Sequence, residues 1–365
     1  MSNLNYIVFG DYSDELKEMT EFSIKEGDVV SIIKNDTTID KAFCKHISGK
    51  VIFVMDLNSI GVNNKALELL EILVDNSNSD SFRDVVAALF IKSKSELYTK
   101  SFSRKFILIC NSVGISFIGH SVIEATASLD NYLMWQKTID KTTREIAIDM
   151  CLKQANRLRE YKNITYDKPK VLVLHASSHE NSNTMMLWHK IKEKINYELS
   201  DSLQIDIDEL HVEDGTVLDC KGCDFTTCMH YAQTRSCFYG GPMVKEILPK
   251  VEKADILIFI APNYNDSISA KLMAVVNRLT VLYRIMSFNN KKIYGLIVSG
   301  NSGSDCVAMQ IIDALNINKG FHLPPNFSVM ETANDPKAIL GVKNLDSDIE
   351  KFVSSFILDN FSKQP

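Results

Sequence analysis

Three polar segments in the C-terminal half contain residue types suited to holding a phosphate and a planar ring. They are 175–184 (HASSHENSNT), 261–267 (APNYNDS) and 299–303 (SGNSG). In the first, hydroxyls, amides and the free N–H groups of a following helix suit a phosphate dianion. In the second, Tyr264 suits contact with a flat ring, and the glycines of the third allow close approach of the backbone. Taken alone, the first segment is equally well explained as a strand-to-helix turn capped by Ser and Asn.

A fourth segment carries half of the eight cysteines, in the order Cys220-x2-Cys223-x4-Cys228-x8-Cys237. Four thiolates so close in sequence suit a [4Fe–4S] cluster or tetrahedral zinc. Cys220 and Cys223 alone also suit a redox-active thiol pair. The residue types leave these alternatives open.

Alternating strands and helices must position these segments. The continuous apolar run 256–260 (ILIFI) predicts a buried central strand, and 170–174 (KVLVL), 203–207, 293–299 and 327–330 predict four more strands. Helical patterns separate them, which is typical of a parallel sheet. The polar segments follow the first, third and fourth strands in sequence. Since ligands collect beyond the carboxyl ends of such strands, we expect all three to converge on one crevice.

The N-terminal half repeats this rhythm. Strand patterns occur at 6–9, 29–33, 51–55, 85–91 and 116–118, and Ser13 is the predicted N-cap of the first helix. A helix near 142–161 and a linker at 162–168 follow. The sequence therefore predicts two tandem α/β domains, residues 1–165 and 166–365, each with a five-stranded parallel sheet and helices on both faces.

The N-terminal copy lacks the chemistry of the C-terminal one. Its first strand ends in GDYSDE (10–15), whose two Asp and one Glu would repel a phosphate. Its third strand is followed by DLNSIG (56–61), which contains no proline or tyrosine, and it has no cysteine cluster. We interpret it as a degenerate copy that keeps the fold without the cofactor loops.

Composition excludes several classes of protein. A formal charge of -6 gives no sign of nucleic-acid binding, which requires a clustered basic surface. No apolar run approaches the roughly 20 residues that span a bilayer. The first residues lack the basic n-region of a secretion signal. A cytoplasmic protein without membrane or nucleic-acid partners is the expectation.

The C-terminal half resembles the NADPH-dependent FMN reductase and iron–sulfur flavoprotein family of flavodoxin-like proteins. The family pattern runs roughly GSPR-x-x-G-N-T, then C-x-G-C-x-x-C, then SPVY-x-x-S-S-A-x-x-K. This chain has SSHENSNT at 177–184, CKGC at 220–223 and APNYNDSISAKL at 261–272. The resemblance spans about 170–325 and implies two flavodoxin-like domains, with FMN held by the second.

The resemblance also implies which residues meet the cofactor. The first loop would hold the phosphate, the second would border the isoalloxazine, and the third would lie at its other edge. These residues are, in chain order, Ser177, His179, Asn181, Ser182, Asn183, Thr184, Pro262, Asn263, Tyr264, Asn265, Gly300, Asn301 and Gly303.

Departures from the family pattern affect both kinds of site. Ser182 replaces a glycine, His179 replaces an arginine, and Asn265 and Asp266 stand where an aromatic residue and a glycine are more usual. The cysteine gaps are longer than in iron–sulfur members. Cys220, Cys223, Cys228 and Cys237 are therefore predicted either to bind a [4Fe–4S] cluster or another metal, or to form a metal-free loop over the flavin.

The function implied is that of an FMN-dependent oxidoreductase, which passes electrons from NAD(P)H through flavin to a quinone, flavin or iron–sulfur acceptor. No G-x-G-x-x-G segment precedes a helix, so NAD(P)H is expected to dock transiently against the flavin. No catalytic residue is assigned. Expected partners are a small-molecule redox substrate or an electron-carrier protein, and a homodimer. The alternative is a non-enzymatic electron-transfer or redox-sensing flavoprotein whose cysteine loop binds an iron–sulfur cluster or zinc.

Overall fold

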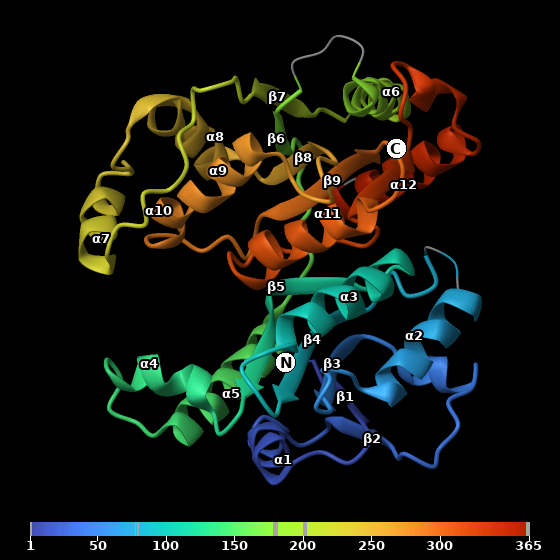
Figure 1. The fold of residues 1–365 in the computed structure, drawn as a ribbon. Helices are drawn as coiled ribbons and strands as arrows, with labels where there is room; N and C mark the ends of the chain where they lie inside the picture. The colour runs from blue at the N-terminus through green and yellow to red at the C-terminus, as the bar shows by residue number, and fades with distance from the viewer. Residues whose placement is uncertain (1, 77, 79, 178–181, 200–202, 363–365) are drawn as a thin grey trace. The chain divides into compact units, whose positions relative to one another are not determined.

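The protein has two compact units, Met1–Lys162 and Asn163–Pro365, called here the N-terminal and C-terminal domains. The computed structural model describes residues 2–76, 78, 80–177, 182–199 and 203–362. Each domain contains a five-stranded, all-parallel sheet with helices on both faces (Figure 1). The predicted fold class, two tandem α/β domains of flavodoxin-like arrangement, is confirmed.

The N-terminal sheet has the strand order β2-β1-β3-β4-β5. Its first helix begins at the predicted cap, where the Ser13 hydroxyl accepts from the Leu16 N–H. The helix that ends the domain begins with a capping box of Thr142 and Glu145. The elements of this domain are β1 (Asn5–Phe9), α1 (Asp14–Glu21), β2 (Val29–Ile33), η1 (Phe43–His46), β3 (Lys50–Asp56), α2 (Asn64–Asn76), β4 (Val86–Ser93), α3 (Thr99–Ser112), β5 (Ser116–Thr126), η2 (Asp130–Tyr132), α4 (Leu133–Gln136) and α5 (Thr143–Glu160).

The C-terminal sheet has the order β10-β9-β8-β6-β7, which is the same topology read from the other edge. The central strands also pair in parallel in both domains: Asn5 of β1 lies opposite Val51 of β3, and Val171 of β6 lies opposite Ile256 of β8. The elements of this domain are β6 (Lys170–His175), α6 (Asn183–Glu198), β7 (Asp206–His211), α7 (Phe225–Gln233), η3 (Met243–Ile247), α8 (Leu248–Lys253), β8 (Ile256–Pro262), α9 (Ala270–Arg278), α10 (Thr280–Tyr283), β9 (Lys292–Ser299), α11 (Ser304–Ile311), η4 (Ile312–Ile317), β10 (Ser328–Thr332), η5 (Ala338–Gly341) and α12 (Leu345–Asn360).

The second strand of the C-terminal sheet lies later than its sequence pattern predicted. The alternation of Leu203, Ile205 and Ile207 placed a strand at 203–207, whereas β7 begins at Asp206 and ends at His211. Most of β7 is polar and exposed, and Leu210 is its one buried residue. As an edge strand, β7 is held by its parallel ladder with β6 rather than by apolar burial on both faces.

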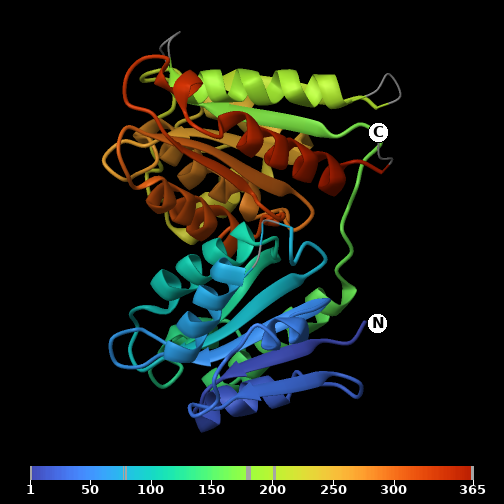
Figure 2. The same ribbon diagram turned by 90° about the vertical axis from the view of Figure 1, so that its right-hand side faces the viewer.

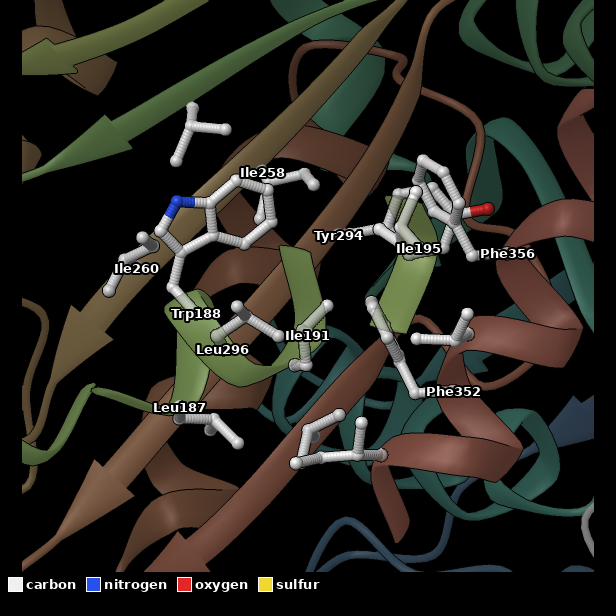
Figure 3. Packing of buried hydrophobic residues seen from close by; sticks show 14 of the residues in the cluster. Leu187, Trp188, Ile191, Ile195, Ile258, Ile260, Tyr294, Leu296, Phe352 and Phe356 are labelled. Atoms are coloured by element: carbon white, nitrogen blue, oxygen red, sulfur yellow. The ribbon is translucent and has the colours of Figure 1, made fainter. Parts of the chain in front are cut away.

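The core of the C-terminal domain forms where α6 and α12 pack on one face of its sheet (Figure 2). Leu187, Trp188, Ile191 and Ile195 share one side of α6, as their helical spacing dictates. They meet Ile258 and Ile260 of β8, Tyr294 and Leu296 of β9, and Phe352 and Phe356 of α12 (Figure 3). This packing fixes the first turn of α6 against the carboxyl ends of the strands.

The segment that follows α5 is tied to the C-terminal domain. The Asn163 amide donates to the Asp359 carbonyl at 3.0 Å, and the Tyr166 N–H donates to the Asn360 carbonyl at 2.8 Å. The buried Lys292 ammonium reaches the Ile164 carbonyl and pairs with the Asp359 carboxylate at 2.9 Å.

Of the helices in the described part of the chain, none is both long and apolar enough to cross a membrane.

Candidate cofactor-binding site

A cavity of about 550 Å³ lies at the carboxyl edge of the C-terminal sheet. The strand order reverses between β6 and β8, and ligands of doubly wound sheets bind at this switch point. The three predicted loops meet there, together with the end of β9 and the segment after β10. The lining residues are Ser177, Ser182, Asn183, Thr184, Pro262, Asn263, Tyr264, Val298, Gly300, Ala333, Asn334 and Pro336.

The first loop delivers hydroxyls to the beginning of α6. The Ser182 hydroxyl accepts from the Met185 N–H and lies 2.9 Å from the Thr184 hydroxyl, which is 2% exposed at residue level. Helix N-termini present unpaired N–H groups and a partial positive charge. Two hydroxyls beside such a terminus can bind an oxyanion.

Asn183 braces this loop against the segment that follows β10. Its amide nitrogen donates to the carbonyls of Ala333 and Asp335, at 3.1 and 2.9 Å, and its oxygen accepts from the Ile339 N–H. The side chain therefore lines the cavity with an amide that already has three protein partners. Its contribution to the site is to hold the loop in place.

The second loop makes a tight turn after β8. Tyr264 and Ser267 exchange two backbone hydrogen bonds, and Asn265 and Asp266 both adopt positive φ, at 54° and 56°. The turn leaves the Tyr264 ring 53% exposed at the rim of the cavity. A half-exposed aromatic ring at a cavity rim can cover one face of a planar ligand.

Asn263 links the second loop to the third. Its amide nitrogen lies 2.9 Å from the Ser299 hydroxyl and 3.0 Å from the Ser302 carbonyl. Gly303 has φ of 87° and begins the turn into α11, a conformation that favours glycine. The two loops thus form one connected wall.

Eight of the thirteen predicted cofactor residues line the cavity: Ser177, Ser182, Asn183, Thr184, Pro262, Asn263, Tyr264 and Gly300. Asn265, Asn301 and Gly303 lie in the same loops outside its lining. His179 and Asn181 fall outside the described residues. Sequence reasoning missed Val298, Ala333, Asn334 and Pro336. The turn-forming run Asn334-Asp335-Pro336 directly after β10 was the available signal, because the switch-point argument applies equally to the fifth strand.

Titratable side chains also lie around the first loop. His175, the last residue of β6, stacks on His211 with ring centroids 4.8 Å apart. Burial, and then the proximity of His211, lowers the pKa of His175. Lys271 of α9 pairs with Asp214 at 2.7 Å and donates to the Ala176 carbonyl at 3.2 Å, so a cation supports the loop from outside.

The cysteine segment lies against the opposite end of α9. The Arg278 guanidinium, on a residue that is 2% exposed, donates to the Cys237 sulfur at 3.3 Å and to the carbonyls of Leu218 and Gly240. The neighbouring Asn277 donates from its amide nitrogen to the Asp219 carboxylate at 2.9 Å. Since α9 is nine residues long, this anchor is roughly 13 Å along the helix from the turn at Ser269. None of the four cysteines lines the cavity.

The four cysteines also do not converge on a common point. Within the described ranges, no group of three or more His, Cys, Asp or Glu side chains is placed to hold a metal ion. All eight cysteines are free thiols. The arrangement therefore does not support the predicted [4Fe–4S] or zinc site at Cys220, Cys223, Cys228 and Cys237. The long gaps between them explain this, because they put Cys228 on α7 and leave the others on flanking loops.

Comparison with known proteins locates the family. Residues 169–335 match the model of the NADPH-dependent FMN reductase family, a span that covers the three loops, the cysteine segment and β10. No curated protein matches the chain.

Solved structures with a similar arrangement are distant. They include an NAD(P)H:quinone oxidoreductase from Methanothermobacter marburgensis (14% identity, TM-score 0.39, 54% of this chain and 100% of that one). Another is an FMN-dependent NADH-azoreductase from Bacillus anthracis in complex with FMN (13%, 0.36, 51% and 99%). A third is RosB with a bound flavin intermediate (19%, 0.38, 53% and 77%). The similarity to this family rests on the family match and not on these structures: residues 169–335, the greater part of the C-terminal domain, match the NADPH-dependent FMN reductase family.

Proposed function

We propose that this chain is an FMN-dependent oxidoreductase that takes electrons from NAD(P)H and delivers them to a small planar acceptor such as a quinone or a flavin. The observation that carries the proposal is the cavity of about 550 Å³ at the switch point of the domain that matches the reductase family. Strand order, loop chemistry and family match all point to the same edge of the same sheet.

The residues present fit the phosphate end of FMN. Ser177, Ser182 and Thr184 would hold the phosphate at the beginning of α6, where hydroxyls and unpaired N–H groups lie together. Asn183 would keep them in position through its bonds to the segment after β10.

The residues also fit the ring end. Pro262, Asn263 and Tyr264 on one side and Gly300 with Asn334 on the other would enclose the isoalloxazine. The Asn263 side-chain oxygen is buried and has no hydrogen-bond partner in the described part of the chain. A buried acceptor without a donor is costly, and a ring N–H of a flavin would satisfy it.

Bound FMN supplies the redox chemistry, accepting a hydride and passing electrons onward. The protein holds the phosphate and ring and excludes water from one ring face. The exposed Tyr264 edge leaves room for NAD(P)H and then an acceptor to approach in turn.

The test is an anaerobic titration of the purified full-length protein with FMN, followed by NADPH or NADH and then a quinone. We expect a flavin spectrum that NAD(P)H bleaches and the quinone restores. Asp208→Asn, on β7 outside the lining, should behave like the wild type. A protein that binds FMN without being reduced by either nucleotide would contradict the proposed donor, and one that binds no FMN would contradict the whole proposal.

A further inference from the structure

Asp266 occupies a backbone conformation that glycine would adopt freely. Its φ is 56°, directly after Asn265 at 54°. Non-glycine residues are uncommon in this region, although Asn and Asp are the side chains that tolerate it best. The turn therefore carries a carboxylate at a position where the backbone alone would favour no side chain.

The Asp266 carboxylate lies across the third loop. One of its oxygens accepts from the Asn263 amide nitrogen at 3.3 Å. A Cβ placed on Gly303 would lie 2.0 Å from that oxygen, so the carboxylate rests directly on the glycine. None of the ion pairs found among the described residues includes Asp266. Its negative charge is therefore not neutralised by a neighbouring cation.

Asn263 connects this charge to the cavity. Its amide nitrogen faces three acceptors, the Asp266 carboxylate, the Ser299 hydroxyl and the Ser302 carbonyl, which fixes the orientation of the amide. The nitrogen side is thus engaged with the loops, and the buried oxygen is the end without a partner. Asn263 lines the cavity, so the Asp266 carboxylate stands one hydrogen bond behind the cavity wall.

We propose that Asp266, acting through Asn263, lowers the reduction potential of the FMN bound in this cavity. The inference rests on the proposed function. Reduction adds negative charge to the ring, and a carboxylate behind the wall disfavours that charge, so the site should hold reduced FMN less tightly than oxidised FMN. Asp266 is a positioning residue, since it acts on the ring through the oriented amide. Its exposure to solvent weakens the effect, because water and salt screen the charge.

The test compares the midpoint potential of bound FMN in the wild type, Asp266→Asn and Asp266→Gly. Both variants suit a positive φ, so both should fold. We expect each to raise the ratio of the dissociation constants for oxidised and reduced FMN about tenfold, which corresponds to a potential about 30 mV higher for a two-electron couple. Asp208→Asn, which changes net charge equally on β7, should leave the potential at the wild-type value.

Direct titration with oxidised FMN separates this proposal from the proposed function. If the wild type binds FMN but Asp266→Asn and Asp266→Gly keep its potential, the role of Asp266 is refuted while FMN binding stands. An equal rise in Asp208→Asn would also refute it, because the shift would then reflect net charge alone. A wild type that binds no FMN removes both proposals.

Discussion

The first helix of each domain begins with a serine cap, but the two helices differ in what lies at their N-terminal end. In each, a serine caps the helix after the first strand: Ser13 for α1 and Ser182 for α6. In the N-terminal domain, the Ser13 N–H donates to the carboxylate of Asp56, the last residue of β3. The last residue of the corresponding strand β8 is Pro262, which lines the cavity. The Asp56 side chain thus sits at a position where the other domain has a cavity.

The environment of Asp56 shows how the N-terminal domain closes this position. Burial is the main influence on the Asp56 carboxyl and raises its pKa. Lys92, which is 8% exposed, lies nearby and 3.9 Å from Glu15. The N-terminal domain does have a cavity of about 490 Å³, but Gly49 and Val85 line it, and they precede β3 and β4. It lies at the amino edge, away from the switch point. The two domains therefore share a scaffold and differ at this edge, where Asp56 accepts a hydrogen bond in one and Pro262 lines a cavity in the other.

Both domains also bury an ion pair that holds the last helix, and breaking either should give the largest effect. Arg159 of α5 pairs with Asp28, and Asp359 of α12 pairs with Lys292. We expect Asp28→Ala and Asp359→Ala each to cost about 3–5 kcal/mol, because a buried charge loses its partner. Denaturant unfolding with hydrogen exchange should localise each loss to its own domain. Asp346→Ala, in the exposed pair with Lys190, should cost less than about 1 kcal/mol. Equal losses in all three would contradict this.

Acid should destabilise the C-terminal domain through a group that the N-terminal domain lacks. This group is His322, and burial lowers its pKa from 6.5 to about 3. The unfolded chain takes up this proton first, so folding stability should be lost as the pH falls from 6.5 towards 3, at about 1.4 kcal/mol per unit. At pH 4.5 the loss should be about 3 kcal/mol. Unfolding free energies at several pH values test this, and His322→Gln should flatten the dependence. An unchanged slope in that variant would show that other groups dominate.

Removing the Asp56 carboxylate should lower the stability of the N-terminal domain only. Asp56→Ala leaves the Ser13 N–H without its acceptor and removes one of the two carboxylates near Lys92, the other being Glu15. We expect a loss of about 2 kcal/mol. Asp56→Asn is the matched control, because it keeps an acceptor oxygen and should retain most of the stability. Chemical denaturation measures both. If Asp56→Ala were as stable as the wild type, the carboxylate would not be filling the helix terminus.

The two serine caps give the smallest but most selective comparison. Ser13→Ala and Ser182→Ala should each lose about 1 kcal/mol of stability through the lost cap. Only Ser182→Ala should also weaken FMN binding, by about tenfold, because its hydroxyl is expected to contact the phosphate. Fluorescence titration with FMN distinguishes the pair. A similar loss of affinity in both variants would remove the distinction drawn between the domains.

Much of this arrangement was predictable because it depends on local patterns. Apolar runs such as 256–260 marked the central strands, and the switch-point rule brought three distant loops to one edge. The pattern failed at β7, where pairing with β6 rather than alternation decides the strand. It also left out the segment after β10: the run from Asn334 signalled a turn there, but only the folded chain shows this segment in contact with Asn183 of the first loop.

The hydrogen-bond partners of individual side chains could not be predicted from the sequence. Nothing in the spacing of Asn183 shows that its amide is already used by the Ala333 and Asp335 carbonyls. Likewise, the order of the cysteines suggested a shared metal, whereas the clamp by Arg278 depends on a helix from elsewhere in the domain. Long-range contacts of this kind are set by packing, and no local rule encodes them.

The stoichiometry of FMN tests the central claim most directly. Equilibrium titration of the full-length apoprotein with oxidised FMN, followed by fluorescence quenching, should saturate at one FMN per chain. Saturation at two would show that the N-terminal domain also keeps a working crevice despite Asp56. No saturable binding would show that the switch-point cavity of the C-terminal domain is not an FMN site.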